Sequence, residues 1–171
     1  MINTKQKHTE ILQEIHPIFQ KKIVELIDNR PNKEMELKAL YALVSYEKQE
    51  QLWLIGRNDQ GEPLYDSLTC KPLTVTSAKG GQSWHNFGLA IDLAYFRNNE
   101  IVNHDENKAA YDDLGKVAKK LGITWGGTFT PYYDATHFQW TAHFTEIQKL
   151  DLLMKKGGLN LVWEEINNNY K

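Results

Sequence analysis

Between residues 83 and 96 the chain reads Ser83-Trp84-His85-Asn86-Phe87-Gly88-Leu89-Ala90-Ile91-Asp92-Leu93-Ala94-Tyr95-Phe96. Residues 89–96 are apolar and partly β-prone, and a polar turn follows them, which predicts a buried strand. Gly88 permits a bend between this strand and the preceding loop. Asp92 is the one charged residue in the strand. An isolated carboxylate in such a place is costly unless it is paired or binds a cation.

A second motif follows some 45 residues later and reads Asp134-Ala135-Thr136-His137-Phe138. Catalytic zinc sites commonly use three ligands from His, Asp and Glu and leave a fourth position open for water. His85, Asp92 and His137 are therefore candidate metal ligands. Asp134 is a spare carboxylate of the kind that can take a proton from the bound water. Each residue alone has an ordinary alternative, namely a salt-bridged or capping aspartate, a core histidine or a turn residue.

The segments before this region predict helices. Apolar residues recur at helical spacing over residues 9–28, with Pro17 as a break or kink. A second helix is expected from Glu34 to Leu43, and a third from Ser45, as its N-cap, to Leu54. Residues 57–82 are rich in Gly, Pro, Asn, Asp, Ser and Thr and predict a long loop.

The segments after it mix strands and helices. A short strand at residues 100–102 is expected to form a hairpin with the strand at 89–96, and further strands are expected at 123–129 and 137–140. Helices are expected at 109–121, at 145–155 up to Gly157-Gly158, and in the tail from residue 161. This order predicts an α+β fold, with N-terminal helices packed on a small, mainly antiparallel sheet that carries the metal site. Residues 1–171 are expected to form a single domain.

Composition limits the classes of function. The chain has 171 residues, of which 41% are hydrophobic and 25% charged, and its formal net charge is −2. No basic stripe is present to bind nucleic acid, and no apolar run is long enough for membrane insertion. The N-terminus does not resemble a signal peptide, and Cys70 has no cysteine partner, so we expect synthesis and folding in the cytoplasm. No exposed heptad pattern argues for assembly, so a monomer is expected.

The paired motif resembles the signature of a known family. Ser83-x-His85-x-x-Gly88-x-Ala90-x-Asp92, followed by Asp134-x-x-His137-Phe138, is similar to the signature of the zinc peptidoglycan peptidases. That family includes D-alanyl-D-alanine carboxypeptidases and L-alanyl-D-glutamate endopeptidases, among them several phage endolysins. The likeness extends from Ser45 to Trp140, and shorter segments also resemble family landmarks: residues 45–49, 52–53, 56–57, 75–76 and 125–127.

The resemblance implies a role for each residue of the motif. His85, Asp92 and His137 would ligate Zn²⁺, and Asp134 would act as the general base and later as the acid. Ser83 would hydrogen-bond the substrate near its carboxylate.

The substrate-binding side departs from the family pattern. Val44 stands where family members usually carry an arginine, and Thr136 stands where a proline is frequent. Arg57 or Lys79 is expected to replace the arginine from the long loop. Tyr132 and Tyr133 are expected to line the substrate cleft.

The resemblance implies zinc-dependent hydrolysis of a peptide bond in the peptidoglycan stem peptide. An L-alanyl-D-glutamate endopeptidase of the endolysin type is preferred. The alternatives are a D-alanyl-D-alanine carboxypeptidase, a non-catalytic zinc-stabilised module that binds the wall or a protein, and a structural virion component. We expect no separate cell-wall-binding domain, and we expect the protein to reach the wall after release by another agent.

The remaining histidines are expected to lie outside the metal site. His8, His16 and His104 are expected to be solvated, and His143 is expected at the surface or behind the metal ligands.

Overall fold

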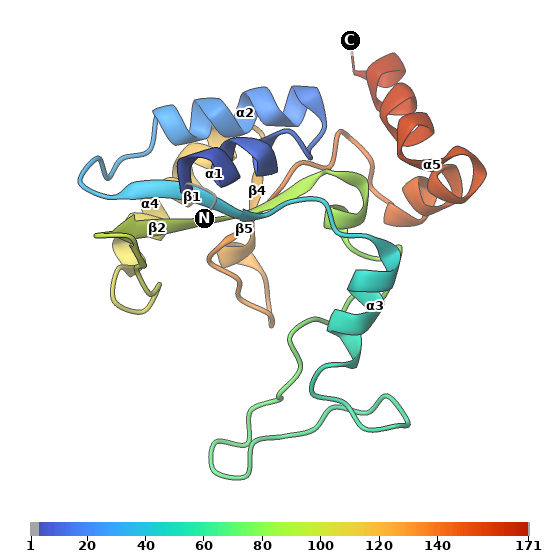
Figure 1. Cartoon of the computed structure of the whole chain (residues 1–171), viewed down its shortest axis with the longest axis horizontal. Helices are drawn as coiled ribbons and strands as arrows, with labels where there is room; N and C mark the ends of the chain where they lie inside the picture. The colour runs from blue at the N-terminus through green and yellow to red at the C-terminus, as the bar shows by residue number, and fades with distance from the viewer. Residues whose placement is uncertain (1–3, 171) are drawn as a thin grey trace.

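The computed structural model describes residues 4–170, which form an α+β fold (Figure 1). The helices are α1 (Thr4–Leu12), α2 (Pro17–Asp28), α3 (Tyr46–Leu54), α4 (Lys108–Lys120) and α5 (Ile147–Asn169), with the short 3₁₀ helices η1 (Trp84–Phe87) and η2 (Gly126–Thr128). The strands are β1 (Glu36–Tyr41), β2 (Ala90–Arg97), β3 (Glu100–Ile101), β4 (Thr124–Trp125) and β5 (His137–Gln139). They form one five-stranded sheet in the order β1-β2-β5-β4, with β3 also paired to β2. Every pairing is antiparallel, so the predicted fold class is confirmed.

Strand β2 lies at the centre of the sheet and separates the core from the site. Because successive side chains of a strand point to opposite faces, Ile91, Leu93 and Tyr95 lie together on one face. All three are fully buried in the hydrophobic core with residues of α2 and α4. Ala90 and Asp92 lie on the opposite face. The alternation of side chains along β2 therefore places the one carboxylate of this strand away from the core.

Strand β1 corrects one prediction. Residues 34–43 are rich in helix-forming residues, and we expected a helix, but residues 36–41 form a strand paired with β2. Burial alternates there, with Met35, Leu37 and Ala39 buried and Glu36 exposed. Pairing with the apolar strand β2 outweighs helix propensity, which amounts to less than about 1 kcal/mol per residue. His8 of α1 completes the pairing, since its Nδ1 accepts a hydrogen bond from Ala39 N at 2.8 Å.

Several helix predictions are confirmed. Pro17 separates α1 from α2 and is the first residue of α2. Ser45 caps α3 and accepts a hydrogen bond from Lys48 N at 3.1 Å. The expected C-terminal helices are the two halves of α5, which is kinked at Gly157 and Gly158.

The strand expected at residues 123–129 is only two residues long. The chain leaves the sheet after Trp125 and turns through η2. This turn brings Gly126 under the segment that carries Asp134, since Asp134 N donates to Gly126 O at 3.1 Å.

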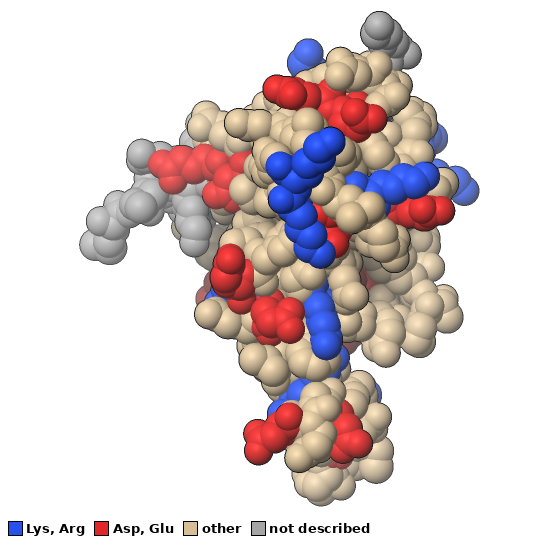
Figure 2. All heavy atoms as spheres, turned by 90° about the vertical axis from the view of Figure 1, so that its right-hand side faces the viewer, with Lys and Arg blue, Asp and Glu red and all other residues tan. Residues whose placement is uncertain are grey.

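The segment of residues 57–82 extends away from the sheet below α3 as a long arm (Figure 1). Two isolated β-bridges, Arg57 with Pro63 and Tyr65 with Pro72, give it some internal order. On the face shown in Figure 2, basic and acidic side chains are interspersed, as the net charge of −2 suggests. Within residues 4–170, no helix combines the length and the apolar character needed to cross a bilayer.

Candidate metal centre

His85 lies in η1, which is capped at both ends. Ser83 Oγ accepts a hydrogen bond from His85 N at 3.3 Å and thereby caps the start of η1. Gly88 ends η1 with φ +65°, a left-handed conformation that favours glycine. The chain then enters β2 directly. This is the bend that the sequence predicted, and it brings the His85 loop back over the strand that carries Asp92.

The connector between β1 and α3 fixes the ring of His85. His85 Nδ1 lies 2.7 Å from Ala42 O, and Val44 N donates to His85 O at 3.1 Å. Because a carbonyl oxygen can only accept, we assign the proton of the neutral ring to Nδ1. His85 Nε2 then presents its lone pair, which is how a histidine with a hydrogen-bonded outer nitrogen binds metal.

His137 is held in a matching way by its own strand. Asp92 and His137 are directly paired across β2 and β5, so their side chains share a face. Gln139, two residues further along β5, lies on the same face. Its Oε1 is 2.9 Å from His137 Nε2. We assign the proton to Nε2, so that Nδ1 of His137 presents its lone pair.

The three candidate ligands converge on one point. His85 Nε2 lies 3.2 Å from His137 Nδ1 and 3.4 Å from Asp92 Oδ1, and Asp92 Oδ1 lies 3.5 Å from His137 Nδ1. Ligand atoms placed tetrahedrally about zinc at ~2.1 Å would be separated by ~3.4 Å. Asp92 Oδ1 is buried and has no hydrogen-bond partner among the described residues. Three acceptor atoms that face one another this closely favour a bound cation, and the residues fit a zinc ion.

The pKa values of this cluster reflect the same convergence. Burial raises the pKa of Asp92, but the nearby imidazoles of His137 and His85 outweigh it and hold the pKa below its usual range. Burial lowers the pKa of His137, but the nearby carboxylate of Asp92, the hydrogen bond of Gln139 and the charge of Asp134 raise it above its usual value. Asp92 is therefore ionised and favours a positive charge at His137, either a proton or a metal ion.

Asp134 lies beside this cluster because Gly126 has no side chain. A Cβ added at Gly126 would lie 2.6 Å from Asp134 O, 3.0 Å from His137 Cβ and 3.3 Å from Asp134 Cβ. Asp134 and His137 therefore both pack against the backbone of Gly126, where no side chain intervenes. Asp134 Oδ1 accepts hydrogen bonds from Thr136 N and Thr136 Oγ1 at 3.1 and 3.0 Å. This side chain is exposed, and its other oxygen remains available to water or substrate.

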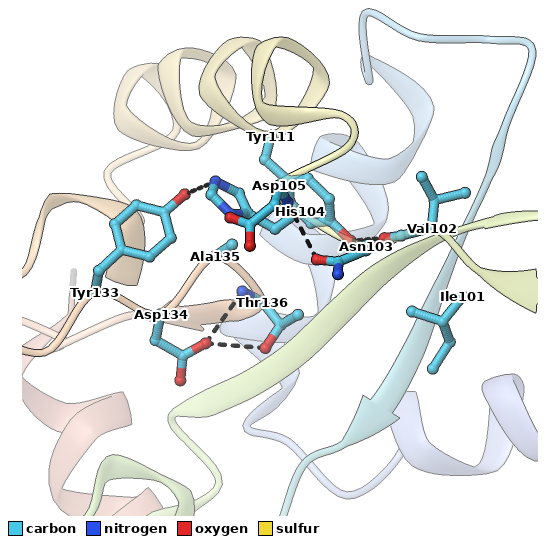
Figure 3. A pocket seen from close by; sticks show the side chains of 10 residues that line it. All are labelled: Ile101, Val102, Asn103, His104, Asp105, Tyr111, Tyr133, Asp134, Ala135 and Thr136. Atoms are coloured by element: carbon cyan, nitrogen blue, oxygen red, sulfur yellow. Dashed lines mark hydrogen bonds and ion pairs between the residues drawn. The ribbon is translucent and has the colours of Figure 1, made fainter. Parts of the chain in front are cut away.

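On its other side, Asp134 lines a hollow of about 520 Å³ (Figure 3). The described residues around it come from two segments, the end of β3 with the loop that leads to α4 and the turn before β5, together with Tyr111 of α4. His104 and Asp105 lie on the first segment, and Tyr133 on the second. The three candidate ligands do not line this hollow. Asp134 therefore lines the hollow and, through Gly126, packs beside His137.

The four predicted substrate-binding residues have different surroundings in the structure. Tyr133 lines the hollow, whereas Tyr132 is 65% exposed. Ser83 lies two residues from His85 and caps η1. The guanidinium of Arg57 bonds the backbone carbonyls of Trp53 and Thr76, so it ties the arm to α3. Contact of any of the four with substrate stays a prediction.

Val44 supports the site through its backbone and not through its side chain. Val44 O accepts a hydrogen bond at 2.9 Å from Nδ2 of Asn86, a buried residue of η1. The structure therefore gives this position a role that does not depend on the arginine usual in the family.

The prediction that His8, His16 and His104 are solvated is wrong. His16 is fully buried between the rings of Trp140 and Trp163. His8 is partly buried against β1, and the side chain of His104 is 19% exposed. His143 stacks on Tyr170 and does not contact the candidate ligands. Sequence reasoning also missed Gln139 and Gly126. The spacing of two residues between His137 and Gln139 on one strand face was the available signal for Gln139, whereas the role of Gly126 depends on a contact between distant segments.

Comparison with known proteins agrees with this geometry. A family model described as D-alanyl-D-alanine carboxypeptidase matches residues 76–140, which contain all three candidate ligands and Asp134. The chain is similar to this family of zinc peptidoglycan peptidases. The resemblance noted in the sequence is thereby confirmed. This similarity, together with the cluster of His85, Asp92 and His137, supports the predicted enzyme class, a zinc metallopeptidase, and the predicted metal.

Individual relatives lie in the same family. The peptidoglycan L-alanyl-D-glutamate endopeptidase CwlK of Bacillus subtilis (strain 168) is 28% identical over 133 residues, which cover 74% of this chain and 73% of that protein. The fold is similar to that of the Serratia marcescens L-Ala D-Glu endopeptidase ChiX, with a TM-score of 0.52, 20% identity, and coverage of 78% of this chain and 86% of that one. It is also similar to the LD-carboxypeptidase LdcB, with a TM-score of 0.52, 20% identity, and coverage of 92% and 70%.

Proposed function

We propose that this chain is a zinc-dependent endopeptidase that hydrolyses the L-alanyl-D-glutamate bond of the peptidoglycan stem peptide. The observation that carries the proposal is the convergence of His85 Nε2, Asp92 Oδ1 and His137 Nδ1 within 3.2–3.5 Å, with Asp134 beside them. The choice of bond is supported by the relative from Bacillus subtilis, which is named for this activity.

Each residue has a defined part in the proposed reaction. His85, Asp92 and His137 would hold the zinc ion, while Ala42 O and Gln139 Oε1 keep the two imidazoles correctly oriented. Bound zinc would lower the pKa of a water molecule towards ~7 and polarise the scissile carbonyl. Asp134 would take the proton from that water and deliver it to the amine that leaves. Thr136 holds one Asp134 oxygen, which leaves the other for this transfer.

The hollow next to Asp134 supports an endopeptidase over a carboxypeptidase. Because Asp134 would protonate the leaving amine, the leaving side of the substrate must lie near Asp134, and the hollow is the space there. Its volume of about 520 Å³ is within the range of ~300–1,000 Å³ that accommodates drug-sized ligands, which are larger than a single alanine. Of the described residues that line it, none is a lysine or arginine that could pair with a terminal carboxylate. A leaving group that continues along the peptide fits this lining.

The experiment combines metal analysis with mass spectrometry of digested muropeptides. The zinc-loaded protein should release L-alanine-terminated and D-glutamate-initiated fragments. Asp134→Asn should retain zinc, and its kcat should be about 10²–10⁴-fold lower than that of the wild type, which is the range for loss of a general base. Asp113→Asn is the matched control, because this exposed carboxylate lies on α4 and pairs with Lys116. It should leave kcat unchanged.

Other results would support the alternatives. Release of a single terminal D-alanine would identify a D,D-carboxypeptidase. Binding to the wall without any new amino terminus would indicate a non-catalytic module. Equal hydrolysis by the wild type and Asp134→Asn would disprove the proposed mechanism.

A further inference from the structure

The turn that carries Asp134 is attached to the rest of the protein at two places. On the C-terminal side, backbone groups hold it, since Asp134 N donates to Gly126 O at 3.1 Å and Trp125 Nε1 donates to Ala135 O at 2.8 Å. On the N-terminal side, residues 131–133 are exposed. The hydroxyl of Tyr133 is hydrogen-bonded there to Nε2 of His104 (Figure 3).

His104 links this turn to the core. Its ring centroid lies 4.6 Å from that of Tyr133 and 5.8 Å from that of Tyr111. Tyr111 belongs to α4 and is buried, with its hydroxyl 3.3 Å from Val102 O. The His104 side chain is only 19% exposed, although its loop lies at the surface. The contacts therefore run from the core through Tyr111 and His104 to Tyr133, which directly precedes Asp134.

The hydrogen-bonding roles in this chain of contacts are consistent. Burial, followed by the charges of Asp112, Asp105 and Asp134, raises the pKa of Tyr133, so its hydroxyl stays protonated and donates. His104 Nδ1 lies 3.1 Å from Asp105 Oδ1. Because that oxygen accepts, we assign the proton of the neutral ring to Nδ1, and Nε2 then accepts from Tyr133.

We propose that His104 is a positioning residue for the peptidase reaction, which holds Tyr133 and thereby fixes the turn that carries Asp134 at the hollow beside His137. The inference rests on the proposed function for the reaction that Asp134 performs. A general base must lie within hydrogen-bond reach of its proton, and a displacement of ~1 Å can cost ~10²-fold in rate. The hydrogen bonds to Gly126 O and from the Trp125 indole remain without His104, so we expect a partial loss of activity.

The test is a set of variants of the zinc-loaded protein. His104→Ala and Tyr133→Phe each remove the hydrogen bond, and the second keeps the aromatic ring. Each should lower kcat about 10-fold while KM changes less than about 2-fold, because the base is displaced and the substrate contacts remain. The double variant should be no slower than either single variant, since the two residues act through one bond. His104→Gln keeps an acceptor and should restore most of kcat, and Tyr65→Phe is the matched control at an exposed tyrosine of the arm.

A second readout does not depend on catalysis. Amide hydrogen exchange of residues 130–135 in the metal-free protein should be faster in His104→Ala than in the wild type, and exchange in β5 should be unchanged. The inference is wrong if the wild type hydrolyses the wall and His104→Ala has the same kcat and the same amide exchange rates as the wild type. A rise in KM at unchanged kcat would also overturn it. If the wild type is inactive on the wall, the proposed function fails, while faster exchange in His104→Ala would still support the positioning of the turn.

Discussion

Asp92 and His137 face each other as a directly paired couple across β2 and β5, with Asp92 Oδ1 3.5 Å from His137 Nδ1. The two residues are far apart in the sequence, yet antiparallel pairing places them on the same face of the sheet. His85 then needs only the bend at Gly88 to bring its Nε2 within 3.4 Å of the same carboxylate oxygen. The register of the sheet therefore assembles most of the metal centre.

The first prediction concerns pH and the metal-free protein. The pKa of His137 is raised, so its proton stabilises the fold fully below the unfolded value of ~6.5. This contribution is lost as pH rises through the folded pKa. The pKa of Asp92 is lowered, so its contribution is present above the unfolded value of ~3.9 and is lost as pH falls through the folded pKa. The pair should therefore stabilise the metal-free protein most between about pH 4 and 6.5.

NMR titration of the histidine rings in the metal-free protein measures this directly. His137 should titrate above the ordinary histidine value, and in Asp92→Asn it should titrate lower. Zinc must displace the His137 proton, so zinc affinity should rise with pH by up to about tenfold per unit until that proton is gone. A His137 that titrates below its ordinary value in the wild type would contradict the pairing.

The second prediction concerns Gln139, which orients the ring of His137 through Nε2. Gln139→Leu removes the acceptor with little change in volume. It should weaken zinc binding about 10–100-fold, the range for loss of an outer hydrogen-bond partner of a ligand. Competition with a zinc chelator measures the affinity. Gln139→Glu keeps an acceptor and should bind zinc at least as well as the wild type; equal affinity of the leucine variant would show that the contact is dispensable.

The third prediction concerns Gly126. In Gly126→Ala the new methyl group would meet Asp134 O at 2.6 Å, so the backbone must move. We expect a loss of about 1–3 kcal/mol in the free energy of unfolding and a fall in kcat of up to about 10²-fold. Steady-state kinetics and urea unfolding give the two values.

Gly122→Ala is the control for that experiment. Gly122 has a positive φ, +70°, unlike Gly126, and only Lys22 Nζ, at 4.0 Å, is near its added Cβ. Gly122→Ala should lower the free energy of unfolding and leave kcat unchanged. If Gly126→Ala keeps a wild-type kcat, the position of Asp134 does not depend on this close approach.

The fourth prediction concerns Asn86, which is buried and organises the segment before the metal ligand. Its Oδ1 accepts from Gly81 N at 2.9 Å, and its Nδ2 donates to Val44 O at 2.9 Å. Asn86→Ala leaves both backbone groups without this partner and should lower the free energy of unfolding by about 2–4 kcal/mol. Asn29→Ala, at the exposed end of α2, should change it by less than about 0.5 kcal/mol. Urea unfolding of both variants provides the comparison, and similar values would contradict the role of Asn86.

The sequence alone determined the chemistry of the site and several local elements. His85, Asp92, Asp134 and His137 were recognisable because their residue types and order are those that a zinc centre requires. Ser45 as a helix cap and Gly88 as a bend were predictable as well, because capping and left-handed turns depend on neighbouring residues only.

The tertiary structure decided what depends on contacts between distant segments. Residues 36–41 form a strand against their own helix propensity because pairing with β2 is available only in the folded chain. The tautomers of both imidazoles depend on Ala42 O and Gln139 Oε1, and the place of Asp134 depends on the bare backbone of Gly126. Local sequence does not encode these distances, since they arise from sheet register and close packing between elements far apart in the chain.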